Sequence, residues 1–300
     1  MMVRRRACIA LAGVLLLALP AAASSGEPAP EPERVFAGLG SWLDIFASDS
    51  WANPAMIVAR AKADGVRTLY LQTSNYSQTA AVVRPAAVGR FVDAAHAAGM
   101  RVVAWYLPGL ERPQLDARRA LAAIRFRSRS GQAFDGFALD IEASIVGDVR
   151  LRNHRLLSLA RLLRRRVGGS YPLGAIVPSP IGMERHPHYW PAFPYAPLAE
   201  TFDAFLPMAY FSYYAHTPQA AFVYARRVIT MLRAHVGPQP LVHMIAGSST
   251  RMPAALLQGF AEAVAACGAQ GISLYAFPET SANDWDVLRH TPLGPARRCA

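Results

Sequence analysis

Lysine is almost absent from this sequence, cysteine is scarce, and no long apolar run interrupts its body. Because Lys62 is the single lysine, the formal net charge of +11 comes from arginine. The basic residues do not interleave with aromatic ones in a pattern typical of nucleic-acid binding, so we expect no nucleic-acid partner. Beyond residue 23 no stretch reaches the ~20 apolar residues of a membrane helix, so we expect no stable span there.

Motifs of two common enzyme classes are missing as well. No GxGxxG follows the first predicted strand, which disfavours a dinucleotide-binding sheet. GxSxG is also absent, so nothing supports a serine nucleophile. His186 and His188 have the spacing of metal ligands, yet no companion cluster accompanies them. We therefore expect neither a metal nor another cofactor.

The first 23 residues have the composition of a secretory signal peptide. A basic head is followed by an apolar stretch over residues 7–19 and by small residues up to Ala23. This predicts a secreted or envelope-associated protein, with an uncleaved anchor as the alternative. Residues 24–37, rich in Pro and Glu, are expected to form an extended linker. The mature chain keeps Cys267 and Cys299, either as a disulfide or as two free thiols.

From residue 38 to the end, short apolar runs alternate with longer segments of helical periodicity. This rhythm predicts repeated βα units with parallel strands buried on both faces. We expect one (β/α)₈ TIM barrel over residues 38–300, with an open doubly wound sheet as the alternative. The predicted strands are residues 40–46, 66–74, 101–108, 134–142, 173–179, 202–210, 241–247 and 271–277.

The run FDGFALDIEAS ends the fourth predicted strand with two acids, Asp140 and Glu142. Side chains alternate along a strand, so both acids share a face with Ala138 and reach the barrel mouth. Two close carboxylates do not ionise independently, and the protonated one is a candidate general acid for glycosidic cleavage. A structural role, in which these acids bind arginine or backbone donors, is the alternative.

Other polar and aromatic residues fall at the predicted strand ends, where barrel enzymes bind their substrates. Aromatic rings suit the apolar faces of sugars, although ordinary barrel filling explains each ring equally well. The candidate substrate-binding residues are Trp42, Asp44, Gln72, Trp105, Tyr106, Met208, Tyr275 and Glu279.

The segment DGFALDIE resembles the DGxDxDxE signature of glycoside hydrolase family 18, the chitinase-like barrels, with Ala138 in place of the second Asp. Asp135 then matches the first Asp, and MAYF resembles the family's MxYD segment, with Phe211 replacing the acid. The resemblance implies that Glu142 protonates the glycosidic oxygen, that Asp140 assists the substrate's N-acetyl group, and that Tyr210 donates a hydrogen bond to it. The segment LDIE also resembles the family 25 lysozymes.

These patterns predict an exported glycoside hydrolase that acts as a monomer on a polysaccharide or cell-wall glycan. A non-catalytic glycan-binding barrel is the alternative, because the motif is incomplete. A third hypothesis is an envelope-associated structural domain held by the arginine-rich segment over residues 150–166. That segment is either a solvated helix face or a surface that attracts an anionic envelope polymer or a membrane.

Overall fold

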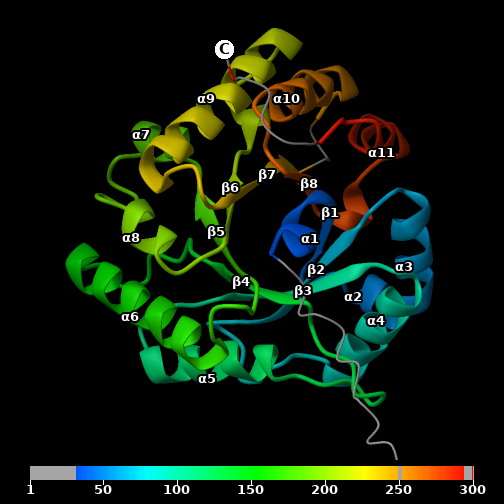
Figure 1. Cartoon of the computed structure of the whole chain (residues 1–300), viewed down its shortest axis with the longest axis vertical. Coiled ribbons are helices and arrows are strands. Elements are labelled where there is room, and N and C mark those ends of the chain that lie inside the picture. Colours follow the sequence, from blue (N-terminus) through cyan, green and yellow to red (C-terminus); the bar gives the residue numbers. More distant parts are fainter. Residues whose placement is uncertain (1–31, 249–251, 294–298, 300) are drawn as a thin grey trace, which may run out of the picture.

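A computed structural model describes residues 32–248, 252–293 and 299 and shows eight parallel strands that close into a barrel (Figure 1). The strands pair in chain order, and the first, β1, pairs with the last, β8, from Gly38↔Gly271 to Ser41↔Leu274. The predicted TIM barrel is therefore confirmed. The strands are β1 Gly38–Leu43, β2 Thr68–Asn75, β3 Arg101–Leu107, β4 Gly136–Asp140, β5 Leu173–Pro178, β6 Ala204–Met208, β7 Leu241–Ser248 and β8 Gly271–Tyr275.

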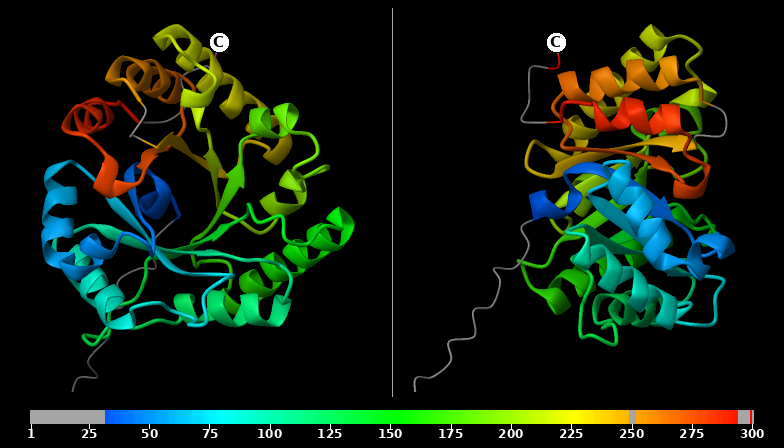
Figure 2. Two further views of the ribbon diagram at one scale, coloured as in Figure 1. Left: turned by 180° about the vertical axis from the view of Figure 1, so that it is seen from behind. Right: turned by 90° about the vertical axis from the view of Figure 1, so that its right-hand side faces the viewer.

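Helices form the outer layer and follow the strands (Figure 2). Several of them begin with proline, whose fixed φ and missing N–H suit the first turn of a helix. Besides the short helix α1, the described helices are α2 Ser48–Ala52, α3 Pro54–Ala63, α4 Pro85–Ala97, α5 Pro113–Ile124, α6 Val149–Val167, α7 Pro180–Arg185, α8 Tyr195–Ala199, α9 Pro218–Val236, α10 Ala254–Ala266 and α11 Ala282–Arg289, with 3₁₀ turns η1 Phe211–Tyr213 and η3 Phe277–Glu279.

The barrel interior is filled by aromatic and aliphatic side chains. Trp42 stacks on Tyr70 with ring centroids 4.1 Å apart and meets Trp105 edge-on at 5.9 Å. The indole N–H of Trp42 donates to Ser273 Oγ at 2.8 Å. The interior is thus a packed core, on top of which any site at the mouth must be built.

Helix α1 (Pro32–Phe36) closes the base of the barrel, the end at which the strands begin (Figure 2). Val35 and Phe36 are fully buried in the interior cluster. Their carbonyls are bound by Thr68 Oγ1 at 2.9 Å and His243 Nδ1 at 2.8 Å. The prediction that all of residues 24–37 form an extended linker is therefore wrong for residues 32–36, because two apolar side chains follow the Pro/Glu run and seal the barrel.

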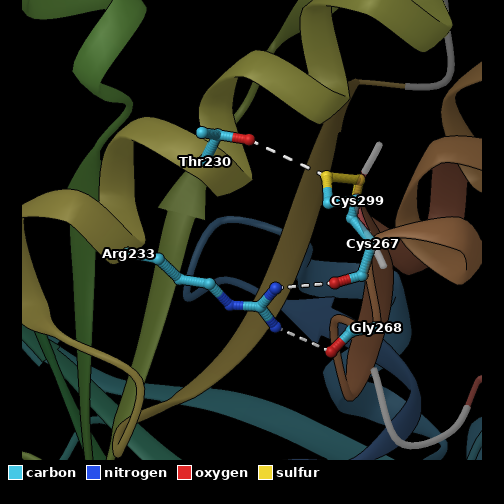
Figure 3. Close-up of a disulfide and its surroundings, with 5 residues drawn as sticks. All are labelled: Thr230, Arg233, Cys267, Gly268 and Cys299. Carbon is cyan, nitrogen blue, oxygen red and sulfur yellow. Dashed lines mark hydrogen bonds between the residues drawn. A yellow bond between two sulfur atoms is a disulfide. The ribbon is translucent and has the colours of Figure 1, made fainter. Parts of the chain in front are cut away.

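The two cysteines of the barrel are joined in a disulfide, Cys267–Cys299, close to helix α9 (Figure 3). Arg233 of α9 donates to the carbonyl oxygens of Cys267 and Gly268 at 2.6 and 2.8 Å, which satisfies acceptors at the end of α10. The disulfide therefore fastens the last described residue to the helical layer at a point where α9 and α10 already meet.

Candidate active site

Strand β4 delivers its last side chain to the interior side of the mouth. Asp140 is only 5% exposed, and its Oδ1 atom has no hydrogen-bond partner among the described residues. Ala138 lies one interior layer below, beside Trp105 of β3 in the strand register. The carboxyl of Asp140 therefore rests on an apolar floor where the resembling family has a second acid.

Glu142 lies just beyond the strand, half-buried, and faces the same space. Burial, reinforced by the charge of Glu142, raises the pKa of Asp140 well above its ordinary value. Burial also raises the pKa of Glu142. The two carboxyls interact, so they titrate as a pair that holds a proton at higher pH than isolated acids do.

A cavity of about 520 Å³ opens beside this pair, over the ends of β4, β5 and β6. Most of its wall is aromatic or thioether surface, with tyrosine hydroxyls as polar points. Such a mixture suits a ligand with apolar faces and hydroxyl or amide edges. The lining residues are Glu142, Pro178, Ser179, Gly182, Met183, His186, Tyr189, Met208, Tyr210, Tyr213, Tyr214 and Tyr224.

Tyr210 occupies the position after β6 that the sequence predicted. Burial and the nearby charges of Asp140 and Glu142 raise its pKa, so the phenol keeps its proton at neutral pH. A neutral phenol next to a carboxyl pair is a hydrogen-bond donor for a ligand oxygen. Met208, at the end of β6, forms part of the same wall.

One wall of the cavity is an arm, residues 186–194, that helix α6 holds in place. The Arg152 guanidinium lies 4.1 Å from the Trp190 ring centroid and donates to the carbonyl of Tyr189 at 3.3 Å. Asn153 accepts from the Trp190 indole N–H at 2.7 Å and donates to the carbonyl of Ala192 at 3.1 Å. The arm is thus fastened to a rigid helix at three points.

The arm also touches the segment that carries the acid. The hydroxyl of Tyr189 donates to the backbone carbonyl of Glu142. Burial, with the charges of Glu142 and Asp140, raises the pKa of Tyr189 to about 12, so this donor stays protonated. Tyr189 therefore positions the Glu142 backbone from the arm.

Tyr106 does not reach the mouth, and the prediction that it binds substrate is wrong. It is fully buried on the outer face of β3, where its hydroxyl donates to Asp116 of α5 at 2.5 Å. Trp42 is 2% exposed within the interior stack, which leaves its rings no free face for a ligand. Trp105 lies in the cluster beneath the mouth, with an unpartnered indole N–H among the described residues.

Two of the residues predicted to bind substrate, Asp44 and Tyr275, instead bind each other across the mouth. Asp44 accepts from the backbone N–H groups of Phe46 and Ala47 and, through its other oxygen, from the Tyr275 hydroxyl at 2.7 Å. This bond ties the end of β1 to the end of β8. The peptide bond after Tyr275 is cis.

The remaining residues predicted to bind substrate, Gln72 and Glu279, lie outside the cavity wall. Gln72 is buried and accepts from the backbone N–H of Ile45 at 3.0 Å, so it holds the loop after β1. Glu279 is exposed in η3 and accepts from Ser248 Oγ at 3.3 Å. Their contact with a ligand stays a prediction without support from this geometry.

Two residues of the compared motifs also lie away from the site. Asp135 sits at the base, where His96, Arg101 and the backbone N–H of Val102 all bind its carboxylate within 3.1 Å. Phe211 is buried in the outer layer, stacked on Phe260 at 4.8 Å. Asp135 therefore anchors the start of β4, and the side chain of Phe211 points away from the mouth.

The sequence reasoning missed most of the tyrosine wall. The run FSYYAH after β6 supplies Tyr213 and Tyr214, and its density of aromatic residues was the available signal. The arm carrying Tyr189 adds His186 and Tyr189 to the same wall. Within the described part of the chain no three His, Cys, Asp or Glu side chains are grouped as metal ligands would be, and no helix there is long and apolar enough to span a membrane.

Comparison with solved structures supports the fold at low identity. The chitinase from Chromobacterium violaceum is 13% identical, with a TM-score of 0.59 over 85% of this chain and 98% of that one. The Bacillus cereus spore cortex-lytic enzyme SleL is 10% identical, with a TM-score of 0.59 over 87% and 76%. An endo-beta-1,4-mannanase from Thermotoga petrophila is 9% identical, with a TM-score of 0.65 over 87% and 77%. No family model and no curated protein matches the sequence.

Proposed function

We propose that this protein is an exported glycoside hydrolase-like enzyme that cleaves O-glycosidic bonds of an N-acetylated or related cell-wall glycan. The observation that carries the proposal is a pair of interacting carboxyls at the mouth of a barrel, buried Asp140 and half-buried Glu142, beside a tyrosine-lined cavity. The similar folds of a chitinase, a cortex-lytic enzyme and a mannanase support it as structural analogy.

In this proposal Glu142 is the general acid. Its raised pKa keeps it protonated at a pH where an exposed Glu has lost its proton, and its half-buried position leaves the carboxyl open to the cavity. Asp140 receives the acetamido group of the sugar: its carboxyl binds the amide N–H while the acetyl oxygen attacks the anomeric carbon, the glycosidic C–O bond breaks and Glu142 gives its proton to the departing oxygen. Water then adds to the anomeric carbon and gives a proton back to Glu142, and the bond to the acetyl oxygen breaks. Tyr210 donates to that acetyl oxygen and orients it.

A non-catalytic glycan-binding barrel is the second candidate, and a specific observation favours it. Ala138 leaves Asp140 without a carboxyl partner below, so the interior cannot share its proton as the family's paired acids do. In this second candidate the cavity binds sugar but does not cleave it, because Asp140 has no interior acid with which to share its proton.

The two candidates separate in one experiment. Purified wild-type protein and Glu142→Gln are incubated with chitin oligosaccharides and with peptidoglycan, and reducing ends and bound glycan are both measured. The enzyme proposal expects hydrolysis by the wild type that falls by a factor of roughly 10²–10⁴ in the variant, while binding persists. Binding by both proteins with hydrolysis by neither overturns it in favour of the second candidate.

A further inference from the structure

The outer layer of the barrel is unevenly charged. Exposed arginines crowd the segment from α5 to α6, whereas the exposed acids of that segment are Glu111 and Asp148, next to the helix starts. Helices α5 and α6 lie side by side (Figure 1). Both run from mouth to base, because each follows the carboxyl end of one strand and leads to the start of the next. Their last turns and the loop after α5 therefore meet at the base.

Six exposed arginines lie at the C-cap of α5, in the loop after it and in the last two turns of α6, and we call them the basal arginine patch: Arg125, Arg127, Arg129, Arg161, Arg165 and Arg166. Within the described residues none of the six makes an ion pair. Of the nearby carboxylates, Asp203 pairs with Arg164 and Asp93 accepts from Ser128 and Ser130, whereas Glu200 is exposed next to Thr201, whose carbonyl Arg164 binds. The patch therefore has a strong excess of positive charge.

The chain enters the barrel at the same end. Helix α1 begins at Pro32, which lines a basal cleft together with Asp203. Asp203 accepts from Arg164 at 2.7 Å, and Arg164 is the neighbour of Arg165 on α6. The 31 residues before Pro32 therefore join the described structure close to the basal arginine patch, while Glu142 opens at the opposite end.

We propose that the basal arginine patch docks the protein onto an anionic phospholipid surface, with the mouth facing away from the lipid. Guanidinium groups bind phosphate oxygens in a bidentate manner, which favours arginine over other cations for this contact. No large exposed apolar side chain lies within residues 125–129 or 161–166, so the contact is electrostatic rather than inserted. This inference does not depend on the proposed enzymatic activity.

The test is sedimentation of the full chain with vesicles of phosphatidylcholine containing about 30% phosphatidylglycerol, compared with pure phosphatidylcholine vesicles. The basal variant is Arg161→Gln/Arg165→Gln/Arg166→Gln. The matched control is Arg112→Gln/Arg118→Gln/Arg150→Gln, which removes the same charge from exposed positions nearer the mouth end of the same helices. Because all three proteins share one N-terminal segment, any contribution of that segment to vesicle binding cancels.

We expect binding to the anionic vesicles that weakens steeply between about 0.05 and 0.5 M salt. Each arginine near such a surface contributes roughly fivefold, so the basal variant should bind about a hundredfold more weakly and the control no more than a few-fold. If the basal variant does not fold, Arg125→Gln/Arg129→Gln replaces it, with an expected loss of roughly 25-fold.

Three results overturn the proposal. The first is wild-type protein that ignores anionic vesicles at low salt. The second is an equal loss in the two triple variants, which means that total charge rather than the patch is responsible. The third is binding to soluble polyphosphate without binding to vesicles, which assigns the patch to a dissolved polyanion.

Discussion

Replacing Asp140 with asparagine should make the protein more stable at neutral pH and not at acidic pH. The folded-state pKa of Asp140 is raised above its unfolded value by burial and by Glu142. The folded state therefore holds this proton more tightly, and stability is lost as pH rises from the unfolded pKa through the folded one. Asparagine has nearly the same shape and never carries the charge, so Asp140→Asn removes that loss.

The size of the effect follows from linkage, because each unit by which the folded-state pKa exceeds the unfolded-state pKa is worth about 1.4 kcal/mol at a pH above both. In a domain of this size each kcal/mol shifts Tm by about 2–4 °C, so we expect a gain at pH 7.5 of roughly 3–6 °C for each unit of that difference. Near pH 3 the carboxyl is protonated in both states, and the gain should vanish. Differential scanning calorimetry of both proteins across this pH range measures it.

Asp135→Asn, at the residue just before the same strand, is the matched control, and it should behave in the opposite way. Burial alone raises the pKa of Asp135, but the bonds and charges of His96 and Arg101, with the Val102 N–H, outweigh burial and hold it below its ordinary value. Removing this carboxylate should destabilise the protein at neutral pH, and the loss should shrink as pH falls through the depressed pKa. A pH-independent gain in Asp140→Asn, or no gain at all, refutes the reasoning.

Three further predictions concern other parts of the molecule. Cys299→Ser opens a loop with a sequence separation of 32 and should lower the free energy of unfolding by about 3–4 kcal/mol in urea titrations, whereas wild-type stability in reductant should approach the variant's. Gly271→Ala places Cβ within 2.0 Å of a histidine ring and should cost about 3 kcal/mol or more, while Gly147→Ala, which meets no atom within 4 Å, should leave Tm unchanged. Tyr189→Phe, which removes the hydroxyl bound to Glu142, should reduce kcat about fivefold with little change in KM on any glycan that the wild type cleaves; a change in KM alone contradicts its positioning role.

The barrel could be predicted from the sequence because its strands are buried on both faces and are separated by amphipathic helices. The same patterning placed Asp140, Glu142 and Tyr210 correctly at the mouth. Alternation within a strand also shows why the two predictions for β3 could not both be right. Trp105 and Tyr106 are adjacent, so they face opposite sides of β3, and Tyr106 faces outward.

Other errors in the predicted site arose because the contacts of its residues form only when the barrel has closed and its loops have folded. Asp44 bonds Tyr275 because β1 meets β8, a pairing between residues 231 positions apart that local pattern cannot reveal. The tyrosine wall depends on how the arm folds back onto α6, through single bonds such as the one from Trp190 to Asn153. Long-range register and loop geometry thus decided which of the plausible residues line the cavity.

The helix that seals the base makes the barrel interior blind-ended. Val35 and Phe36 occupy that end, and aromatic and aliphatic side chains fill the interior above them. A proton that leaves or reaches Asp140 must therefore travel through the mouth, past Glu142 and the tyrosine wall. A ligand seated in the cavity would lie across this route and slow the exchange of the Asp140 proton with solvent.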